Sequence, residues 1–341
     1  MKTSSIFIAG IGTAPVPRLE TADAVARGWY DADERARSEL VSITTAGATP
    51  APDLAVTAAQ VAIATSGQQP ADFGVVFHTN VHPQGPEGWS AQHYINRRTI
   101  NQPVPSMEIR NGCIGFLSTL QLAAMYLTTA SDRPAALLTC ADNFGTPTVD
   151  RWNASKLFVL ADGGGAVVLS RTGGFARVLA LGSVSAPELE ERHRSGETMF
   201  PPSLTVGGAL NFEERTSHFQ RRMNEGVLRP ESDFGSVVIE VVERTLKEAD
   251  TSMDEIARVV HDGFTFWALQ DLFLDPIGVP VERGIWDYTR TVGHAGPADQ
   301  IRGLEYLLRT GQVGPGDRVL LFTGGPGMEA AAAVVEIDAR P

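Results

Sequence analysis

The order helix, acidic turn, strand occurs once in each half of this chain, and this repeat constrains the fold more than any other feature. The first copy has a helical pattern over residues 55–64, followed by a strand pattern over residues 74–79. The second copy has a helical pattern over residues 236–249, followed by a strand pattern that ends at Val260. The repeat predicts an internal duplication with two similar domains, residues 1–171 and residues 172–341.

Strand and helix patterns alternate along the rest of the chain, which predicts an α/β fold with a mostly parallel sheet and helices on its faces. Further strand patterns cover residues 6–11, 107–110, 136–140, 165–170, 176–185, 318–323 and 330–337. Further helical patterns cover residues 114–128, 266–274 and 298–309. Residues 188–233 form a polar, charge-rich excursion between these patterns.

Composition limits the function. The chain has 341 residues, of which 43% are hydrophobic, so it can bury a large core. Two cysteines cannot build a disulfide framework, which favours a reduced, cytoplasmic protein. A net charge of -12 disfavours nucleic acid as a partner, because phosphate binding needs a basic surface. We expect no membrane partner either, since no stretch reaches the roughly 20 apolar residues of a membrane helix.

Cys113 stands between a strand pattern and a helical pattern, with Gly112 and Gly115 close on either side. Gly112 permits a tight turn, and Gly115 permits the close approach of another backbone. The thiol then lies at a helix N-terminus, where unpaired amides and the helix dipole stabilise a thiolate, the nucleophilic form of cysteine. A buried structural cysteine is the alternative, and it suits Cys140, which lies inside an apolar run. The two glycines favour a catalytic nucleophile at Cys113.

Five motifs stand in a defined order along the chain: Asn111-Gly112-Cys113-Ile114-Gly115, Asp162-Gly163-Gly164-Gly165-Ala166, Val260-His261, Val292-Gly293-His294-Ala295-Gly296 and Gly324-Gly325-Pro326-Gly327. Together they resemble the β-ketoacyl-ACP synthase III-like branch of the thiolase fold, over nearly the whole chain. The resemblance implies two duplicated halves stacked in five layers, α-β-α-β-α. It also implies an acyl-CoA or acyl carrier protein thioester as donor, no cofactor, and a homodimer that pairs through a strand near the nucleophile helix.

His294 is the main departure from that family. A condensing member holds an enolate with two donors, a His and an Asn, and His294 occupies the expected Asn position. Gly296-Pro297 predicts an N-cap and a first-position proline, which puts Asp299 at the third position of a helix, where its carboxylate is stabilised. Cys113, His294 and Asp299 would then act as nucleophile, base and orienting carboxylate. That set resembles the O-acyltransferring and starter-unit members of antibiotic pathways.

His261 is a further catalytic candidate, because it ends a strand pattern at the position of the family's first active-site histidine. The following Asp262-Gly263-Phe264 departs from the family's pattern, so a plain loop histidine is the alternative. The resemblance also implies an oxyanion hole formed by the backbone N–H groups of Cys113 and Gly325.

His78, His82 and Phe264 are the candidate substrate-binding residues. His78 and His82 lie where the strand pattern over residues 74–79 ends, so they are placed to line an acceptor pocket. We expect no metal site, because no cysteine or carboxylate completes a ligand set with these histidines. Arg97-Arg98 and Arg221-Arg222 are the candidate docking patches for an acidic acyl carrier protein.

These features predict an acyltransferase that forms a Cys113 acyl-enzyme and passes the acyl group to the hydroxyl or amine of a small-molecule acceptor in antibiotic biosynthesis. One alternative is a decarboxylating β-ketoacyl-ACP synthase III that makes a carbon–carbon bond. A second is an α/β-hydrolase, because Asn111-x-Cys113-x-Gly115 is close to a G-x-C-x-G elbow. A non-enzymatic alternative is a silent partner subunit, which the presence of Cys113 disfavours.

Overall fold

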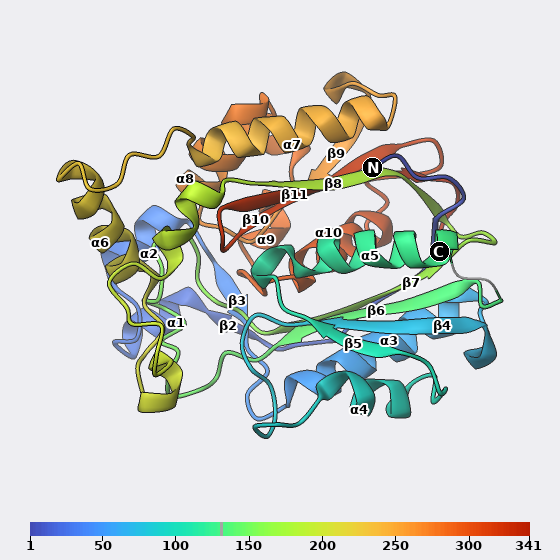
Figure 1. Cartoon of the computed structure of the whole chain (residues 1–341), viewed down its shortest axis with the longest axis horizontal. Coiled ribbons are helices and arrows are strands. Elements are labelled where there is room, and N and C mark those ends of the chain that lie inside the picture. The colour runs from blue at the N-terminus through green and yellow to red at the C-terminus, as the bar shows by residue number, and fades with distance from the viewer. Residues whose placement is uncertain (130–131) are drawn as a thin grey trace.

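A computed structural model describes residues 1–129 and 132–341 of the chain. Its main sheet has nine strands in the order β5-β4-β6-β7-β1-β8-β11-β10-β9 (Figure 1). Their bounds are β1 Phe7–Thr13, β4 Phe73–Thr79, β5 Ser106–Ile109, β6 Ala135–Asp142, β7 Gly163–Ser170, β8 Ala176–Ser185, β9 Ile256–Val260, β10 Arg318–Gly325 and β11 Glu329–Ile337. A small second sheet pairs β2 (Arg18–Glu20) with β3 (Ser42–Thr44).

The α-helices of the described residues are α1 Thr21–Ala26, α2 Ala32–Ser38, α3 Ala51–Ser66, α4 Ala91–Arg98, α5 Gly115–Thr129, α6 Phe212–Asn224, α7 Phe234–Glu248, α8 Phe266–Leu269, α9 Trp286–Thr289 and α10 Ala298–Arg309. The helical pattern expected over residues 266–274 divides into α8 and a π-helical turn, Gln270–Leu274. The charge-rich excursion carries α6 and the 3-10 segments Pro187–His193 and Ser203–Val206. Most of the predicted elements are present within a few residues of their expected bounds.

The two halves repeat one topology. The series β1, α3, β4, α5, β6, β7 is matched by β8, α7, β9, α10, β10, β11, and the strand orders 4-6-7-1 and 9-10-11-8 correspond. Each acidic turn is a single 3-10 turn closed by a capping box, Pro70–Asp72 in the first half and Met253–Glu255 in the second. β5 is the extra strand, at the outer edge of β4.

The expectation of a mostly parallel sheet is wrong. β4 is parallel to β5 and β6, and β9 is parallel to β10. The central pairings, β6–β7, β7–β1, β1–β8, β8–β11 and β11–β10, are all antiparallel. The physical reason is that β6 is followed by β7, and β10 by β11, without the crossover helix that a parallel pair requires.

The elements stack in five layers, α-β-α-β-α, as predicted (Figure 1). α3 packs on β1, β6 and β7, and α7 packs on β8 and β11. α5 contacts β4 and β6 of the first half and also β8 and β11 of the second. α10 likewise contacts β1 and β7 as well as β9 and β10. These two helices therefore form the central layer, and the segments that precede them face each other inside the protein.

The segment Gly112–Thr129, which contains α5, is long and apolar enough to cross a membrane by length and composition alone. Half of it is buried inside the protein, where α5 packs between the two halves of the sheet. Its apolar character therefore has a structural cause in the central layer.

Close packing of α3 on the sheet explains Gly10 and Gly12. A Cβ on Gly10 would lie 2.0 Å from the Ala62 carbonyl oxygen, and one on Gly12 would lie 2.3 Å from the Ala58 carbonyl oxygen. Both atoms belong to the backbone of α3, which cannot yield as a flexible side chain can. These glycines therefore serve close helix–sheet contact.

Gly12→Ala is expected to lower the free energy of unfolding by about 1–3 kcal/mol, because the added methyl group overpacks the contact between β1 and α3. Gly314→Ala is the matched control, since a Cβ there meets no atom within 4 Å. Urea unfolding followed by circular dichroism measures both. Equal midpoints for the two variants would contradict the close contact.

Candidate active site

Cys113 lies in a 3-10 turn, Gly112–Ile114, directly before α5. Gly112 has a φ of 54°, and a Cβ there would come within 2.6 Å of the Pro326 ring. A Cβ on Gly115 would come within 2.0 Å of the Thr79 hydroxyl oxygen, so this glycine accommodates a side chain at the end of β4. Both flanking glycines are thus required by packing, and they hold the nucleophile turn between the two halves.

His294 is held opposite Cys113 by backbone pairing. Its N–H donates to the Val159 carbonyl at 3.1 Å, and its carbonyl accepts from the Ala161 N–H at 2.7 Å. Gly293 and Gly296 on either side have φ values of 68° and 60°, in the left-handed region that favours glycine. The loop before α10 therefore presents the imidazole in one orientation.

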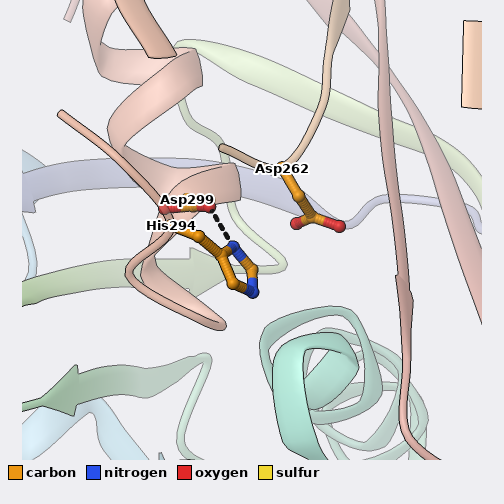
Figure 2. A group of neighbouring side chains, drawn as sticks. All are labelled: Asp262, His294 and Asp299. Atoms are coloured by element: carbon orange, nitrogen blue, oxygen red, sulfur yellow. Dashed lines mark hydrogen bonds and ion pairs between the residues drawn. The ribbon is translucent and has the colours of Figure 1, made fainter. Parts of the chain in front are cut away.

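Cys113, His294 and Asp299 form one hydrogen-bonded chain. The Cys113 Sγ lies 3.0 Å from His294 Nε2. His294 Nδ1 donates to Asp299 Oδ2 at 2.7 Å (Figure 2). Asp299 also accepts from the Gly263 N–H at 2.8 Å and from the Ala295 N–H at 2.9 Å. Because an ionised carboxylate only accepts, Nδ1 of His294 carries a proton, and Nε2 is the ring nitrogen that faces the thiol.

The charges of the site follow from burial and from these contacts. Burial raises the pKa of the Cys113 thiol, and the adjacent His294 opposes this rise. Burial alone would lower the pKa of His294, but the charges and hydrogen bonds of Cys113 and Asp299 raise it well above its ordinary value. Burial would raise the pKa of Asp299, but His294, Arg302 and the Gly263 N–H hold it below its ordinary value. The site thus has a buried thiol beside a strong base rather than an isolated thiolate.

Arg302 supports the carboxylate from one turn further along α10. Its Nη1 lies 3.9 Å from Asp299 Oδ1, and its Nη2 donates to the Thr44 hydroxyl at 3.2 Å. A Cβ on Gly163 would lie 3.1 Å from Nη1, so this glycine of β7 makes room for the guanidinium. Arg302 was not among the residues predicted from the sequence, although its spacing of three residues from Asp299 on a helix is a usable signal.

Asp299 is the second residue of α10, because the helix begins at Ala298 with Pro297 as its N-cap. The predicted third position in the helix is therefore wrong by one residue. Asp299 is still in the first turn, and its carboxylate does reach back to the loop that carries His294.

The structure does not bring His261 into contact with Cys113 or His294. Its Nδ1 donates to the Asp262 carbonyl at 2.9 Å, and its Nε2 accepts from the Ile285 N–H at 3.0 Å. Burial lowers its pKa to about 4, so it is neutral and both ring nitrogens are engaged with the backbone. Asp262, the next residue, carries the side chain that faces the site. Successive side chains of a strand point to opposite faces, so only one of these two adjacent residues can face the site.

His78 and His82 are not on the wall of the cavity that contains Cys113. His78 is fully buried in β4, where Nδ1 contacts the Thr139 hydroxyl at 2.9 Å, and burial lowers its pKa to about 4. The ring of His82 lies 6.4 Å from that of Phe144, which does line the cavity. His78 is a core residue because every position of β4 is buried. Phe264 does line the cavity, with its ring 5.1 Å from His294.

A cavity of about 410 Å³ leads to Cys113 and His294. Its aromatic wall consists of Phe144, Phe158, Phe212, Phe234, Phe264, Trp267 and Phe273. Its polar and charged lining residues are Arg37, Ser155, Lys156, Arg192, His193, Glu213 and Thr216. Four of these, Arg192, His193, Glu213 and Thr216, belong to the charge-rich excursion over residues 188–233. Its polar composition gave no indication in the sequence that it lines the site.

Gly324 and Gly325 also line the cavity, at the end of β10, where both are paired with β11. A Cβ on Gly325 would lie 3.5 Å from the Cys113 backbone nitrogen, so the two residues expected to form an oxyanion hole are neighbours. The Gly324 N–H is engaged, because it donates to Asp262 Oδ2 at 3.2 Å.

Asp262, His294 and Asp299 are the group among the described residues that could present three ligand atoms to a metal, within 4.8 Å of one another. Their lone pairs are already used. Both carboxylates accept several N–H or O–H donors, and the two ring nitrogens of His294 contact Asp299 and Cys113. The donor set fits a proton relay better than a metal centre.

Family models match the two regions that carry the site. The model of 3-oxoacyl-[acyl-carrier-protein] synthase III matches residues 107–185, and the model of its C-terminal part matches residues 246–337. The β-ketoacyl-[acyl-carrier-protein] synthase III of Sphingopyxis alaskensis is 25% identical over 290 residues, and that of Coxiella burnetii is 23% identical over the same length. Each alignment covers 83% of both chains.

Solved structures are similar to this chain over nearly its whole length. A structure described as ChlB3, an acyltransferase, is 37% identical, covers 98% of both chains and superposes with a TM-score of 0.93. The 3-oxoacyl-[acyl-carrier-protein] synthase III of Aquifex aeolicus is 19% identical, covers 97% of this chain and 99% of its own, and has a TM-score of 0.77. The latter likeness concerns the fold alone.

Proposed function

The chain belongs to the 3-oxoacyl-[acyl-carrier-protein] synthase III family of the thiolase superfamily, and on this premise we propose that it transfers an acyl group from a CoA or carrier-protein thioester to the hydroxyl or amine of a small-molecule acceptor. The observation that carries the proposal is the 2.7 Å hydrogen bond between His294 and Asp299, with Cys113 3.0 Å from the other ring nitrogen. This arrangement is that of a nucleophile with an oriented general base. The likeness to the acyltransferase ChlB3 supports the acyl-transfer part of this proposal. We place the reaction in antibiotic biosynthesis.

In the first half-reaction, Cys113 gives its proton to His294 Nε2 while Sγ attacks the thioester carbonyl carbon. The oxyanion of the tetrahedral intermediate lies against the N–H groups of Cys113 and Gly325. The carbon–sulfur bond to the donor then breaks, and His294 returns the proton to the leaving thiolate. The product is a Cys113 acyl-enzyme.

In the second half-reaction, the acceptor hydroxyl gives its proton to His294 Nε2 as its oxygen attacks the acyl carbon. A carbon–oxygen bond forms, the bond to Cys113 Sγ breaks, and the proton passes from His294 to Cys113. Asp299 holds the Nδ1 proton throughout and stabilises the imidazolium that forms between the two transfers. General-base help of this kind contributes typically about 10²–10⁴-fold to the rate.

Decarboxylating condensation with a malonyl thioester is the main alternative. It requires neutral donors around an enolate, whereas this site places the strongly basic His294 and the carboxylates of Asp262 and Asp299 close together. The test is to incubate the enzyme with acyl thioester and either malonyl carrier protein or a panel of hydroxyl and amine acceptors. We expect acylated acceptor and no β-ketoacyl product. A β-ketoacyl product formed as fast as acyl transfer would overturn the proposal.

The other two alternatives fit poorly. An α/β-hydrolase does not have the duplicated strand order 4-6-7-1 and 9-10-11-8 of this sheet. A silent partner subunit has no need of a thiol hydrogen-bonded to a base that is itself paired with a carboxylate.

A carrier protein would dock near the cavity mouth. Of the two arginine pairs named above, Arg221-Arg222 lies on α6, and Phe212 and Thr216 of the same helix line the cavity. Arg222 is paired with Glu191, whereas the side chain of Arg221 is exposed. Arg97 and Arg98 are exposed at the end of α4. We favour the α6 patch because it adjoins the entry to Cys113.

We expect the enzyme to be a homodimer. β5 ends the sheet of the described residues, directly before the nucleophile turn, and Met107 at its centre is 40% exposed. An edge strand presents backbone donors and acceptors that a second copy can pair with. Sedimentation velocity at micromolar concentration should give a dimer, and a monomer would contradict the expectation.

A further inference from the structure

Asp262 is a buried carboxyl group with no part in the two half-reactions described above. It directly follows His261 after β9, and it is 1% exposed. Its carboxylate accepts from the Thr323 hydroxyl at 2.9 Å, the Gln300 side-chain amide at 3.0 Å and the Gly324 N–H at 3.2 Å. Acceptance from donors on both oxygens favours the ionised form, whereas burial raises the pKa of this carboxyl to about 7, so Asp262 is a second buried negative charge towards higher pH.

The carboxylate of Asp262 lies close to the imidazole of His294. One carboxylate oxygen of Asp262, one nitrogen of His294 and one carboxylate oxygen of Asp299 all lie within 4.8 Å of one another, and Figure 2 shows His294 between the two carboxyl groups. The other charged or titratable group in contact with His294 among the described residues is Cys113, and Arg302 pairs with Asp299. His294 therefore has Asp299 hydrogen-bonded to Nδ1 and Asp262 near by without a hydrogen bond.

We infer that Asp262 is a positioning residue whose carboxylate stabilises the imidazolium form of His294 and fixes the end of β10, at Gly324 and Gly325, beside Cys113. The inference rests on the proposed function for its catalytic meaning. An opposite charge within about 4–6 Å favours the protonated imidazole, and the shift it produces is typically about 1–3 pKa units. The bond from the Gly324 N–H ties the same carboxylate to the end of β10 that meets the Cys113 backbone nitrogen.

Titration of the His294 ring tests the inference without any substrate. We would label the seven histidines with ¹⁵N in a Cys113→Ala background, so that no thiolate acts on the ring, and identify His294 by the signal lost in His294→Gln. Asp262→Asn should lower the His294 midpoint by about one unit. Burial raises the pKa of Asp262 to about 7, so the shift should be largest where the carboxylate is ionised, towards higher pH.

Thr323 provides a matched pair should Asp262→Asn fail to fold. Thr323→Val removes the hydroxyl donor at constant shape, which favours protonation of Asp262, so the His294 midpoint should also fall. Thr323→Ser keeps the hydroxyl and should leave the midpoint unchanged. Loss of stability with an unmoved His294 midpoint in the folded variants would reduce Asp262 to a structural role and overturn the inference. Because the measured quantity is the titration midpoint of the His294 ring, the result does not depend on whether any thioester acylates Cys113.

Discussion

Cys113→Ala is expected to abolish the acyl mass adduct that forms when the enzyme meets its thioester donor. Among the described residues that line this cavity, Cys113 carries the thiol, and its Sγ lies within hydrogen-bond distance of a base; alanine removes the sulfur at the turn between Gly112 and Gly115. Intact-protein mass spectrometry after incubation with a panel of acyl-CoA and acyl-carrier thioesters measures the adduct directly.

Cys140 is the matched control for that experiment. It is fully buried in β6, and burial raises the pKa of its thiol far above the ordinary value, so it should not react. Cys140→Ala should therefore keep the adduct. An adduct that survives Cys113→Ala would place the nucleophile elsewhere.

Asp299→Asn is expected to slow transfer from the acyl-enzyme to the acceptor by about 10²–10⁴-fold, while the acyl-enzyme still forms. An amide cannot accept from His294 Nδ1, the Gly263 N–H and the Ala295 N–H as the two carboxylate oxygens do. It also removes one of the two charges, those of Cys113 and Asp299, that raise the pKa of His294. Single-turnover decay of pre-acylated enzyme, followed by mass spectrometry with and without acceptor, separates the two half-reactions.

The pH dependence of this decay shows in which direction the rate of acyl transfer changes as His294 loses its proton. His294 acts as a base only when it is neutral, so acyl transfer should increase as pH rises through the pKa of His294. Loss of the Asp299 charge lowers that pKa, so the acid limb of Asp299→Asn should move to lower pH although its maximum rate is smaller. Asp254→Asn, at an exposed turn, is the control and should match the wild type. Equal decay rates in Asp299→Asn and the wild type would remove Asp299 from the mechanism.

The sequence predicted the duplicated halves because hydrophobic periodicity and the acidic turns are local properties. It also predicted the positions of Cys113, His294 and Asp299, since each stands in a short glycine-bearing motif whose order along the chain is specific. The geometry then brought the three side chains into one hydrogen-bonded chain. The sheet direction was predicted wrongly, because strand patterns do not encode whether a partner runs parallel or antiparallel.

The side chains that line the site were harder to predict. His261 and Asp262 are adjacent, and which of them faces His294 depends on the twist of the chain after β9, which no motif encodes. The aromatic wall draws Phe158, Phe212 and Phe273 from distant segments, so only the tertiary structure assembles it. Gly163 stands in a glycine run that is easily recognised in the sequence. That its missing Cβ leaves room for Arg302 beside Asp299 follows only from the tertiary structure.

The equivalence of α5 and α10 has a consequence for how such a site could have arisen. Cys113 closely precedes α5, and His294 and Asp299 flank the start of α10, so the two segments that carry the hydrogen-bonded chain occupy the same place in the two repeats. A single ancestral half that associated with a copy of itself would have brought two such helix starts face to face across a symmetry axis. The reactive centre could then have existed before the gene fusion, with one helix start later specialising in nucleophilic attack and the other in proton transfer.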